Sequence, residues 1–149
     1  MTEITIRPVA ADDRARWEPL WLGYIAFYEK RLPQATTDFT WKRILDPANP
    51  IEALLAVDAQ NNALGLVQYL LHESTWNTGG NVYLQDLFVV PEARGLRIGR
   101  RLIEAVAEIS RKKGAGVLYW QTEEFNGTAR RLYERLAKRA PFVRYNIEL

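Results

Sequence analysis

Hydrophobic and polar residues follow one another in patterns that predict a chain of both strands and helices. Residues 3–8 alternate between apolar and polar, as a short strand does. After Asp12 or Asp13, either of which can cap a helix, apolar residues recur at helical spacing. Residues 38–45 predict a second, short helix that ends at Asp46-Pro47. The apolar stripe of the first helix is Trp17, Leu20, Trp21, Tyr24, Ile25 and Tyr28.

The rest of the chain predicts a hairpin followed by alternating strands and helices. A polar turn separates two apolar segments, and the next apolar segment ends at Pro91. The resulting order, β-α-α-β-β-β-α-β-α-β, predicts an α/β fold with a mixed central sheet flanked by helices. Residues 1–149 are expected to form a single domain. The predicted strands are residues 51–58, 63–72, 81–90, 117–122 and 142–149, and the predicted helices are 98–113 and 128–138.

Composition excludes several classes of chemistry. The chain has no cysteine and one histidine, His72, so disulfides, thiol catalysis and a histidine zinc site are excluded, and no metal is expected. No stretch approaches 18 uncharged apolar residues, so no membrane span is expected. The first 13 residues lack the basic and apolar regions of a secretion signal, so we expect a cytoplasmic location.

Charge is distributed unevenly. The residues before Arg94 include 7 basic and 12 acidic side chains, a net charge of −5, whereas Arg94 and the residues after it include 13 basic and 6 acidic ones, a net charge of +7. Such a division suggests an anionic ligand for the second part, although solvated helix faces give similar counts. Four arginines within eight residues, Arg94, Arg97, Arg100 and Arg101, suit phosphate recognition.

These arginines lie where a strand, a tight turn and a helix start follow one another, in residues 89–106. Backbone amides at such a helix start can hold a pyrophosphate. The segment lacks the Lys-Ser or Lys-Thr of a Walker loop and the three spaced glycines of a dinucleotide site, so a different phosphate ligand is expected.

The hexapeptide Arg94-Gly95-Leu96-Arg97-Ile98-Gly99 resembles the acetyl-CoA motif of the GCN5-related N-acetyltransferase (GNAT) superfamily. The stretch YLQDLFVVPEARGLRIG is similar to the spermidine/spermine (polyamine) acetyltransferases, and WQTEEFNGTARRLYERLAKRAPF to the yeast histone and polyamine acetyltransferase branch. The resemblance covers nearly half of the chain, and the predicted order of elements agrees with that family's fold. It implies an acetyl-CoA-dependent N-acetyltransferase.

The resemblance also implies roles for individual residues. The backbone of Leu87, Phe88 and Val89 would meet the pantetheine arm and acetyl group, Asn126 would touch the pantetheine, and Tyr133 would lie beside the thioester sulfur. The pyrophosphate would be held by backbone amides and arginine side chains in the stretch Arg94, Gly95, Leu96, Arg97, Ile98, Gly99 and Arg100.

Acetylation of an amine needs a base for the amine proton and an acid for the leaving thiolate. We expect Tyr133 to be the acid, and Asp86, Glu29 or a water molecule held by Gln85 to take the amine proton. The chain departs from the family twice. Arg97 replaces a glycine, and a side chain there does not readily accept positive φ. Gln85 replaces a glutamate of the polyamine enzymes and cannot accept a proton.

Each of these residues also has a structural interpretation. Tyr133 suits half-buried packing on a helix, Asp86 a buried carboxylate paired with an arginine, and Asn126-Gly127 a turn or helix cap. His72 is expected at a surface or strand end. The aromatic residues Trp21, Tyr24, Tyr28 and Trp41 are expected in the core, although a substrate cage is the alternative.

The acceptor stays open among a polyamine, an amino acid and a lysine-like or peptidyl amine. We expect acidic side chains near Trp76 and Trp120 to attract the acceptor as a cationic amine. A non-catalytic acyl-CoA sensor and, less favoured, a basic nucleic-acid-binding module are the alternatives. The resemblance implies a homodimer in which residues 141–149 form an interface strand. The acidic side chains are Glu29, Asp38, Glu73, Glu123 and Glu124.

Overall fold

The computed structural model describes residues 3–123 and 126–149. Five strands form one sheet in the order β1-β2-β3-β4-β5. The pairs β1–β2, β2–β3 and β3–β4 are antiparallel, and β5 runs parallel to β4. This confirms the α/β class and the mixed sheet. The strands are β1 (Thr5–Pro8), β2 (Ile51–Val57), β3 (Ala63–His72), β4 (Asn81–Val89) and β5 (Val117–Tyr119).

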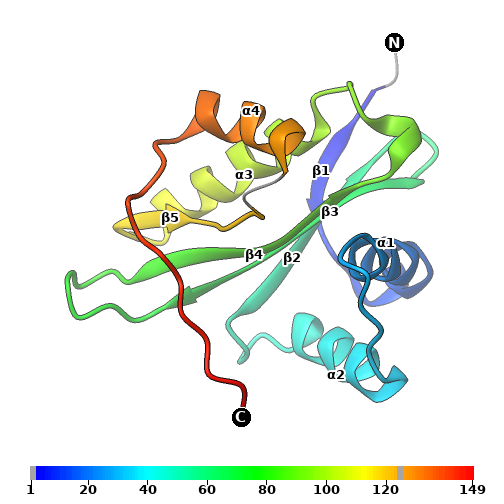
Figure 1. Cartoon of the computed structure of the whole chain (residues 1–149). Helices are drawn as coiled ribbons and strands as arrows, with labels where there is room; N and C mark the ends of the chain where they lie inside the picture. Colours follow the sequence, from blue (N-terminus) through cyan, green and yellow to red (C-terminus); the bar gives the residue numbers. More distant parts are fainter. Residues whose placement is uncertain (1–2, 124–125) are drawn as a thin grey trace.

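Helices cover both faces of the sheet (Figure 1). One core cluster lies between the sheet and α1 and α2, around the fully buried Trp17. The other lies beneath α3 and α4, around the fully buried Leu102 and Val106. The helices are α1 (Arg14–Phe27), α2 (Gln34–Leu45), α3 (Ile98–Lys112) and α4 (Gly127–Leu136), with the short 3-10 turns η1 (Ala11–Asp13) and η2 (Pro91–Ala93).

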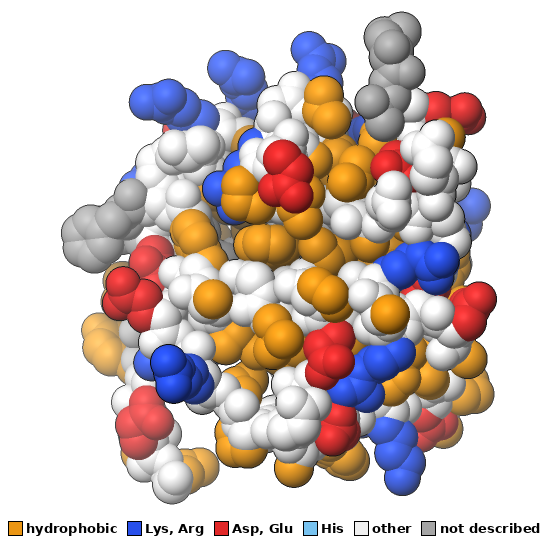
Figure 2. Space-filling view, turned by 90° about the vertical axis from the view of Figure 1, so that its right-hand side faces the viewer, with side chains coloured by type: hydrophobic (Ala, Val, Ile, Leu, Met, Phe, Trp, Pro, Cys, Tyr) orange, Lys and Arg blue, Asp and Glu red, His pale blue; other side chains and the backbone are white. Residues whose placement is uncertain are grey.

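Seen from the right-hand side of Figure 1, a band of hydrophobic side chains crosses the middle of the molecule, and basic side chains project from its upper edge (Figure 2). Among the described residues, no helix combines the length and apolar character needed to cross a membrane.

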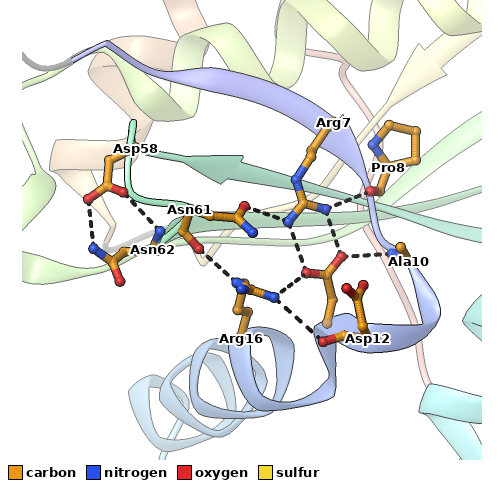
Figure 3. A network of polar contacts seen from close by, with 9 residues as sticks. Arg7, Pro8, Ala10, Asp12, Arg16, Asp58, Asn61 and Asn62 are labelled. Carbon is orange, nitrogen blue, oxygen red and sulfur yellow. Dashed lines mark hydrogen bonds and ion pairs between the residues drawn. The ribbon is translucent and has the colours of Figure 1, made fainter.

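A buried carboxylate joins β1, the start of α1 and the turn between β2 and β3 (Figure 3). Asp13 is fully buried and accepts from both Nη atoms of Arg7, at 2.7 and 2.9 Å, from Arg16 at 3.1 Å and from the Ala10 amide at 2.8 Å. The two arginines also donate to Asn61. Asp13 therefore occupies the cap position of α1 but forms an ion-pair network in place of a side-chain cap.

The largest differences from the predicted elements lie in α2, in β5 and at the end of the chain. Helix α2 begins at Gln34, four residues before the predicted Asp38, because Pro33 fits the start of a helix. Strand β5 ends at Tyr119 and not at residue 122. The closing strand over residues 142–149 is wrong, since that segment has no helix or strand and all its side chains are exposed.

Candidate active site

A β-bulge in β4 divides the side chains of that strand between the two faces of the sheet. Gln68 of β3 lies opposite Asp86, but the next residue of β3, Tyr69, lies opposite Leu84, so Gln85 is an extra residue. Before the bulge, Leu84 packs into the core beneath α3. After it, Phe88 packs against α1, with its ring over Gly23. The extra residue therefore turns Asp86 toward α1.

Asp86 is 8% exposed and accepts a hydrogen bond from Gln68 Nε2 at 2.8 Å. Burial raises the pKa of Asp86 to about 6, while the Gln68 hydrogen bond and the Tyr24 hydroxyl oppose that rise. The expected arginine partner is wrong: among the described residues, Asp86 faces an amide and tyrosines. A carboxylate in this environment can exchange a proton near neutral pH.

Strands β4 and β5 part close to Asp86. Their pairing runs from Asn81 with Val117 to Tyr83 with Tyr119. Beyond Tyr83, no described strand pairs with β4 on that side. The backbone of residues 87–89 therefore lies along a gap, where a ligand can meet its N–H and C=O groups.

The turn after β4 leaves a row of amides open at the start of α3. Arg101 is the first residue of this segment to donate to a helical carbonyl, that of Arg97 at 3.0 Å. In the described part of the chain, the amides of residues 95–100 have no backbone acceptor. No atom lies within 4 Å of the position that a Cβ of Gly95 would take, so the space over the turn is open.

Arg97 adopts the conformation that was not expected of it. Its φ is 61° and its ψ 21°, in the left-handed region, and Gly95 also has positive φ, at 92°. A non-glycine residue pays on the order of 1 kcal/mol for this conformation. The left-handed conformation of Arg97 turns the chain into the first turn of α3.

The arginine side chains around the turn differ in their partners. Arg94 Nε donates to the Val89 carbonyl at 3.2 Å, and Arg100 forms an ion pair with Glu104 at 2.8 Å. Arg97 and Arg101 are exposed and have no ion-pair partner within the described residues.

Helix α4 brings Tyr133 to the other side of the gap. Asn126 caps this helix by accepting from the Ala129 amide at 3.3 Å, as its structural interpretation predicted. Tyr133 is half-buried, and its ring centroid lies 5.5 Å from that of Trp120. Burial, followed by the charge of Tyr28, raises the pKa of Tyr133 to about 12. Tyr133 therefore keeps its proton at neutral pH.

Tyr28 links the surroundings of Asp86 and Tyr133. Burial raises its pKa, the neighbouring Tyr24 lowers it, and the charges of Glu123 and Asp86 raise it. Tyr24 and Tyr28 are in ring contact at 5.0 Å. Asp86 thus lies among phenol groups, with Glu123 nearby.

A match to a protein-family model identifies the family of this chain. The model of the acetyltransferase (GNAT) family matches residues 15–137. The chain belongs to the acetyltransferase (GNAT) family. As a GNAT enzyme it is an acetyl-CoA-dependent acetyltransferase, and the open amides and the gap beside β4 fit that substrate.

Two relatives and one solved structure are similar to this GNAT chain. The D-amino-acid N-acetyltransferase of Saccharomyces cerevisiae is 32% identical over 143 residues, which are 95% of this chain and 89% of that protein. The thialysine N-epsilon-acetyltransferase of Bos taurus is 40% identical over 73 residues, 49% of this chain and 42% of that protein. The ribosomal-protein-alanine N-acetyltransferase of Brucella melitensis shares the fold, with a TM-score of 0.82 at 24% identity, over 99% of this chain and 100% of that one.

The structure of the GNAT protein separates the expected base candidates. Asp86 is buried in the site, Gln85 is the exposed extra residue of the bulge, and Glu29 is exposed just beyond α1, with positive φ of 54°. No described interaction connects Glu29 with Asp86 or Tyr133.

Several other residues that were expected near the amine lie outside the site. Asp38 forms an ion pair with Arg14, Trp76 is 94% exposed, and Glu124 lies outside the described residues. His72 ends β3, as expected, but its Nε2 lies 2.7 Å from the Tyr119 hydroxyl. No group of three or more metal-ligating side chains occurs in the described part of the chain.

The sequence did not identify Gln68, whose side chain accepts from Trp17 Nε1 and donates to Asp86. A single glutamine within the apolar run ALGLVQYLLH was the available signal, because a buried amide requires polar partners.

Proposed function

We propose that this enzyme moves the acetyl group of acetyl-CoA directly to a primary amine while both substrates are bound, and that residues 1–149 form one acetyltransferase domain. The observation that carries the proposal is the Asp86 carboxylate, which the bulge of β4 buries beside the gap between β4 and β5. Its pKa of about 6 leaves it mostly ionised at pH 7, as a base for an amine must be.

Acetyl-CoA supplies the activated acetyl group in this proposal. The backbone of Leu87, Phe88 and Val89 faces the acetyl group and the pantetheine arm along the gap. The amides of residues 95–100 hold the pyrophosphate, and Arg97 and Arg101 offer free cationic side chains to phosphate. Asn126 contacts the pantetheine arm in addition to capping α4.

The alkylammonium ion first releases one proton to solvent, and Asp86 accepts the second proton while the neutral nitrogen bonds to the acetyl carbonyl carbon. A free alkylamine has a pKa near 10.4, but the nitrogen becomes acidic as the new bond forms, so a base of pKa about 6 suffices. Tyr133 donates its proton to the sulfur when the carbon–sulfur bond breaks. Glu29, or a water molecule held by Gln85, is the alternative base, and their exposure makes Asp86 the better one.

The surroundings of Asp86 suit a cationic amine, because aromatic rings and carboxylates attract cations. Polyamines, amino acids and lysine-like or peptidyl amines all meet this requirement, and the names of the two relatives favour amino acids. A further observation agrees with them: the Arg144 guanidinium, held by Gln121 at 2.7 Å, acts electrostatically on Tyr83 beside Asp86. Arg144 is thus suited to an acceptor that carries a carboxylate.

Lysine and cadaverine form a matched pair for this question, since cadaverine is lysine without its carboxylate. We expect a higher kcat/KM for lysine, and Arg144→Gln should narrow the difference. Equal kcat/KM values for lysine and cadaverine in the wild type would show that the carboxylate takes no part in acceptor recognition.

Calorimetry with acetyl-CoA and dephospho-CoA, followed by turnover of the amine panel, tests the function itself. Binding that weakens without the 3′-phosphate, together with acetylation that Asp86→Asn reduces by about 100-fold or more, is the expected result. Binding without turnover of any amine would favour the acyl-CoA sensor. Salt-sensitive DNA or RNA binding without acetyl-CoA binding would favour the nucleic-acid module.

We further propose a cytoplasmic homodimer. The outer edge of β5 has no partner strand among the described residues, and the segment after α4 exposes a row of large apolar side chains. These are Phe142, Val143, Tyr145, Ile147 and Leu149.

A further inference from the structure

A chain of buried hydrogen bonds connects α1 with Asp86 through β3. Trp17 Nε1 donates to Gln68 Oε1 at 2.8 Å, and Gln68 Nε2 donates to Asp86 Oδ2 at 2.8 Å. Trp17 is fully buried and Gln68 is 2% exposed, so water does not compete for these groups.

The chemistry of the three groups permits one orientation of the Gln68 amide. The indole N–H of Trp17 only donates, so the oxygen of the amide must face it. The NH₂ group of the amide then faces Asp86 and meets an ionised carboxylate as a donor. The reverse orientation would oppose two donors at Trp17 and two acceptors at Asp86, and both hydrogen bonds would be lost.

We propose that Gln68, oriented by Trp17, is a positioning residue of the acetyl transfer: it holds Oδ2 of Asp86 and so fixes the carboxylate that takes the proton of the amine. This inference rests on the proposed function of Asp86 as the base. Gln68 itself lies beneath the site, on the strand opposite Asp86, and does not meet the substrate.

The hydrogen bond from Gln68 also keeps Asp86 ionised, because it lowers the pKa that burial raises. The other titratable groups around Asp86 are phenols, Tyr24 and Tyr28 from α1 and Tyr83 from β4 itself. Burial raises the pKa of each of the three above 10, so none titrates between pH 5 and 8. In this range Asp86 is the group of this cluster that gains or loses a proton.

A neighbouring tryptophan supplies a matched control. Trp21 is also a buried residue of α1, stacks on Trp17 and donates through Nε1 to the buried Thr37 at 3.2 Å. Trp21→Phe and Trp17→Phe therefore each remove one buried indole hydrogen bond from the same core cluster. The hydrogen bond of Trp17 leads through Gln68 to Asp86, whereas the hydrogen bond of Trp21 ends at Thr37.

The experiment compares Gln68→Met, Trp17→Phe and Trp21→Phe with the wild type. The acidic limb of kcat/KM against pH and the NMR titration of the Asp86 carboxyl carbon are measured for each, and circular dichroism checks the fold. We expect Gln68→Met to move both to higher pH by about one unit, and Trp17→Phe by about half a unit, since a charge-assisted hydrogen bond is lost or loosened. Trp21→Phe should lose stability without either shift.

Different outcomes separate the two proposals. If neither titration moves in folded Gln68→Met and Trp17→Phe, or if Trp21→Phe moves both as much, the positioning role is wrong while Asp86 stays the base. If the acidic limb of the wild type persists in Asp86→Asn, or if no amine is acetylated, the proposed function fails and the positioning role in catalysis fails with it.

Discussion

Tyr133 is half-buried on α4 and keeps its proton, because burial raises its pKa to about 12. A phenol of this kind can protonate a leaving thiolate. Tyr133→Phe should therefore lower kcat by about 100-fold or more and leave the Kd of acetyl-CoA nearly unchanged. Steady-state kinetics and calorimetry check this. Tyr119→Phe, which removes a hydroxyl bonded to His72, is the control and should keep its kcat. An unaltered kcat in Tyr133→Phe would exclude the acid role.

The buried Asp86 carboxylate lowers the stability of the folded protein at neutral pH. Its pKa rises from 3.8 to about 6 in the folded protein, so folding favours the protonated form. As the pH rises from about 4 to 6, ionisation of Asp86 lowers the free energy of unfolding. Above pH 6 this loss amounts to about 3 kcal/mol. Asp86→Asn should therefore be more stable than the wild type at pH 8, and the two should converge near pH 4. Urea unfolding at both pH values measures this. Equal stability at pH 8 would show that burial of the charge is not costly.

Among the elements, β1, α1 and the β2–β3 turn are joined by Asp13. Its pairing with Arg7 lowers the pKa of Asp13 to about 2. The ionised form is thus favoured by folding, and its contribution is complete above pH 4 and lost as the pH falls toward 2. Asp13→Asn should cost about 2 kcal/mol at pH 7 and less at pH 3.

Asp12→Asn is the control for this network, because it removes an exposed carboxylate one residue away. Urea unfolding of the two variants at pH 7 and pH 3 measures the difference. If the Asp13 network does not stabilise the fold, Asp13→Asn and Asp12→Asn will both be as stable as the wild type.

Elements whose stability depends on their own side chains were predictable from the sequence. Helix α3 carries its apolar stripe and its glycine stop in one segment, and it begins at the predicted Ile98. Residues 142–149 alternate as a strand does but pair with no strand among the described residues. A strand depends on a partner that its own sequence does not reveal.

The candidate site was predictable to the extent that its residues belong to local motifs. The turn around Gly95 and the cap at Asn126 are of this kind. The partner of Asp86 was not predictable, since Gln68 is 18 residues away and meets it through a change of register. The same shift decides which face of the sheet receives Asp86, and no residue type marks it.

For the molecule as a whole, association is the property to test. Light scattering should give twice the 17.2 kDa mass of the chain. Ile147→Asp should shift the mass toward that of the monomer, because a charge in an apolar interface is costly. Leu22→Asp alters a side chain that is exposed on α1, at 51%, and should leave the mass unchanged. A wild type of 17.2 kDa at all concentrations would refute the homodimer.

The extra residue in β4 also makes the register of that strand part of the enzyme's chemistry. Gln85 is exposed, so many other side chains can replace it. Pairing it into a regular ladder is a different matter, because the residues on one half of the strand would then exchange faces of the sheet. Asp86 would enter the aliphatic layer beneath α3, and the tyrosines of α1 would face an apolar side chain. Two chains with the same helices and strands could therefore differ in this one register, while only the chain with the bulge keeps its acid in reach of an amine.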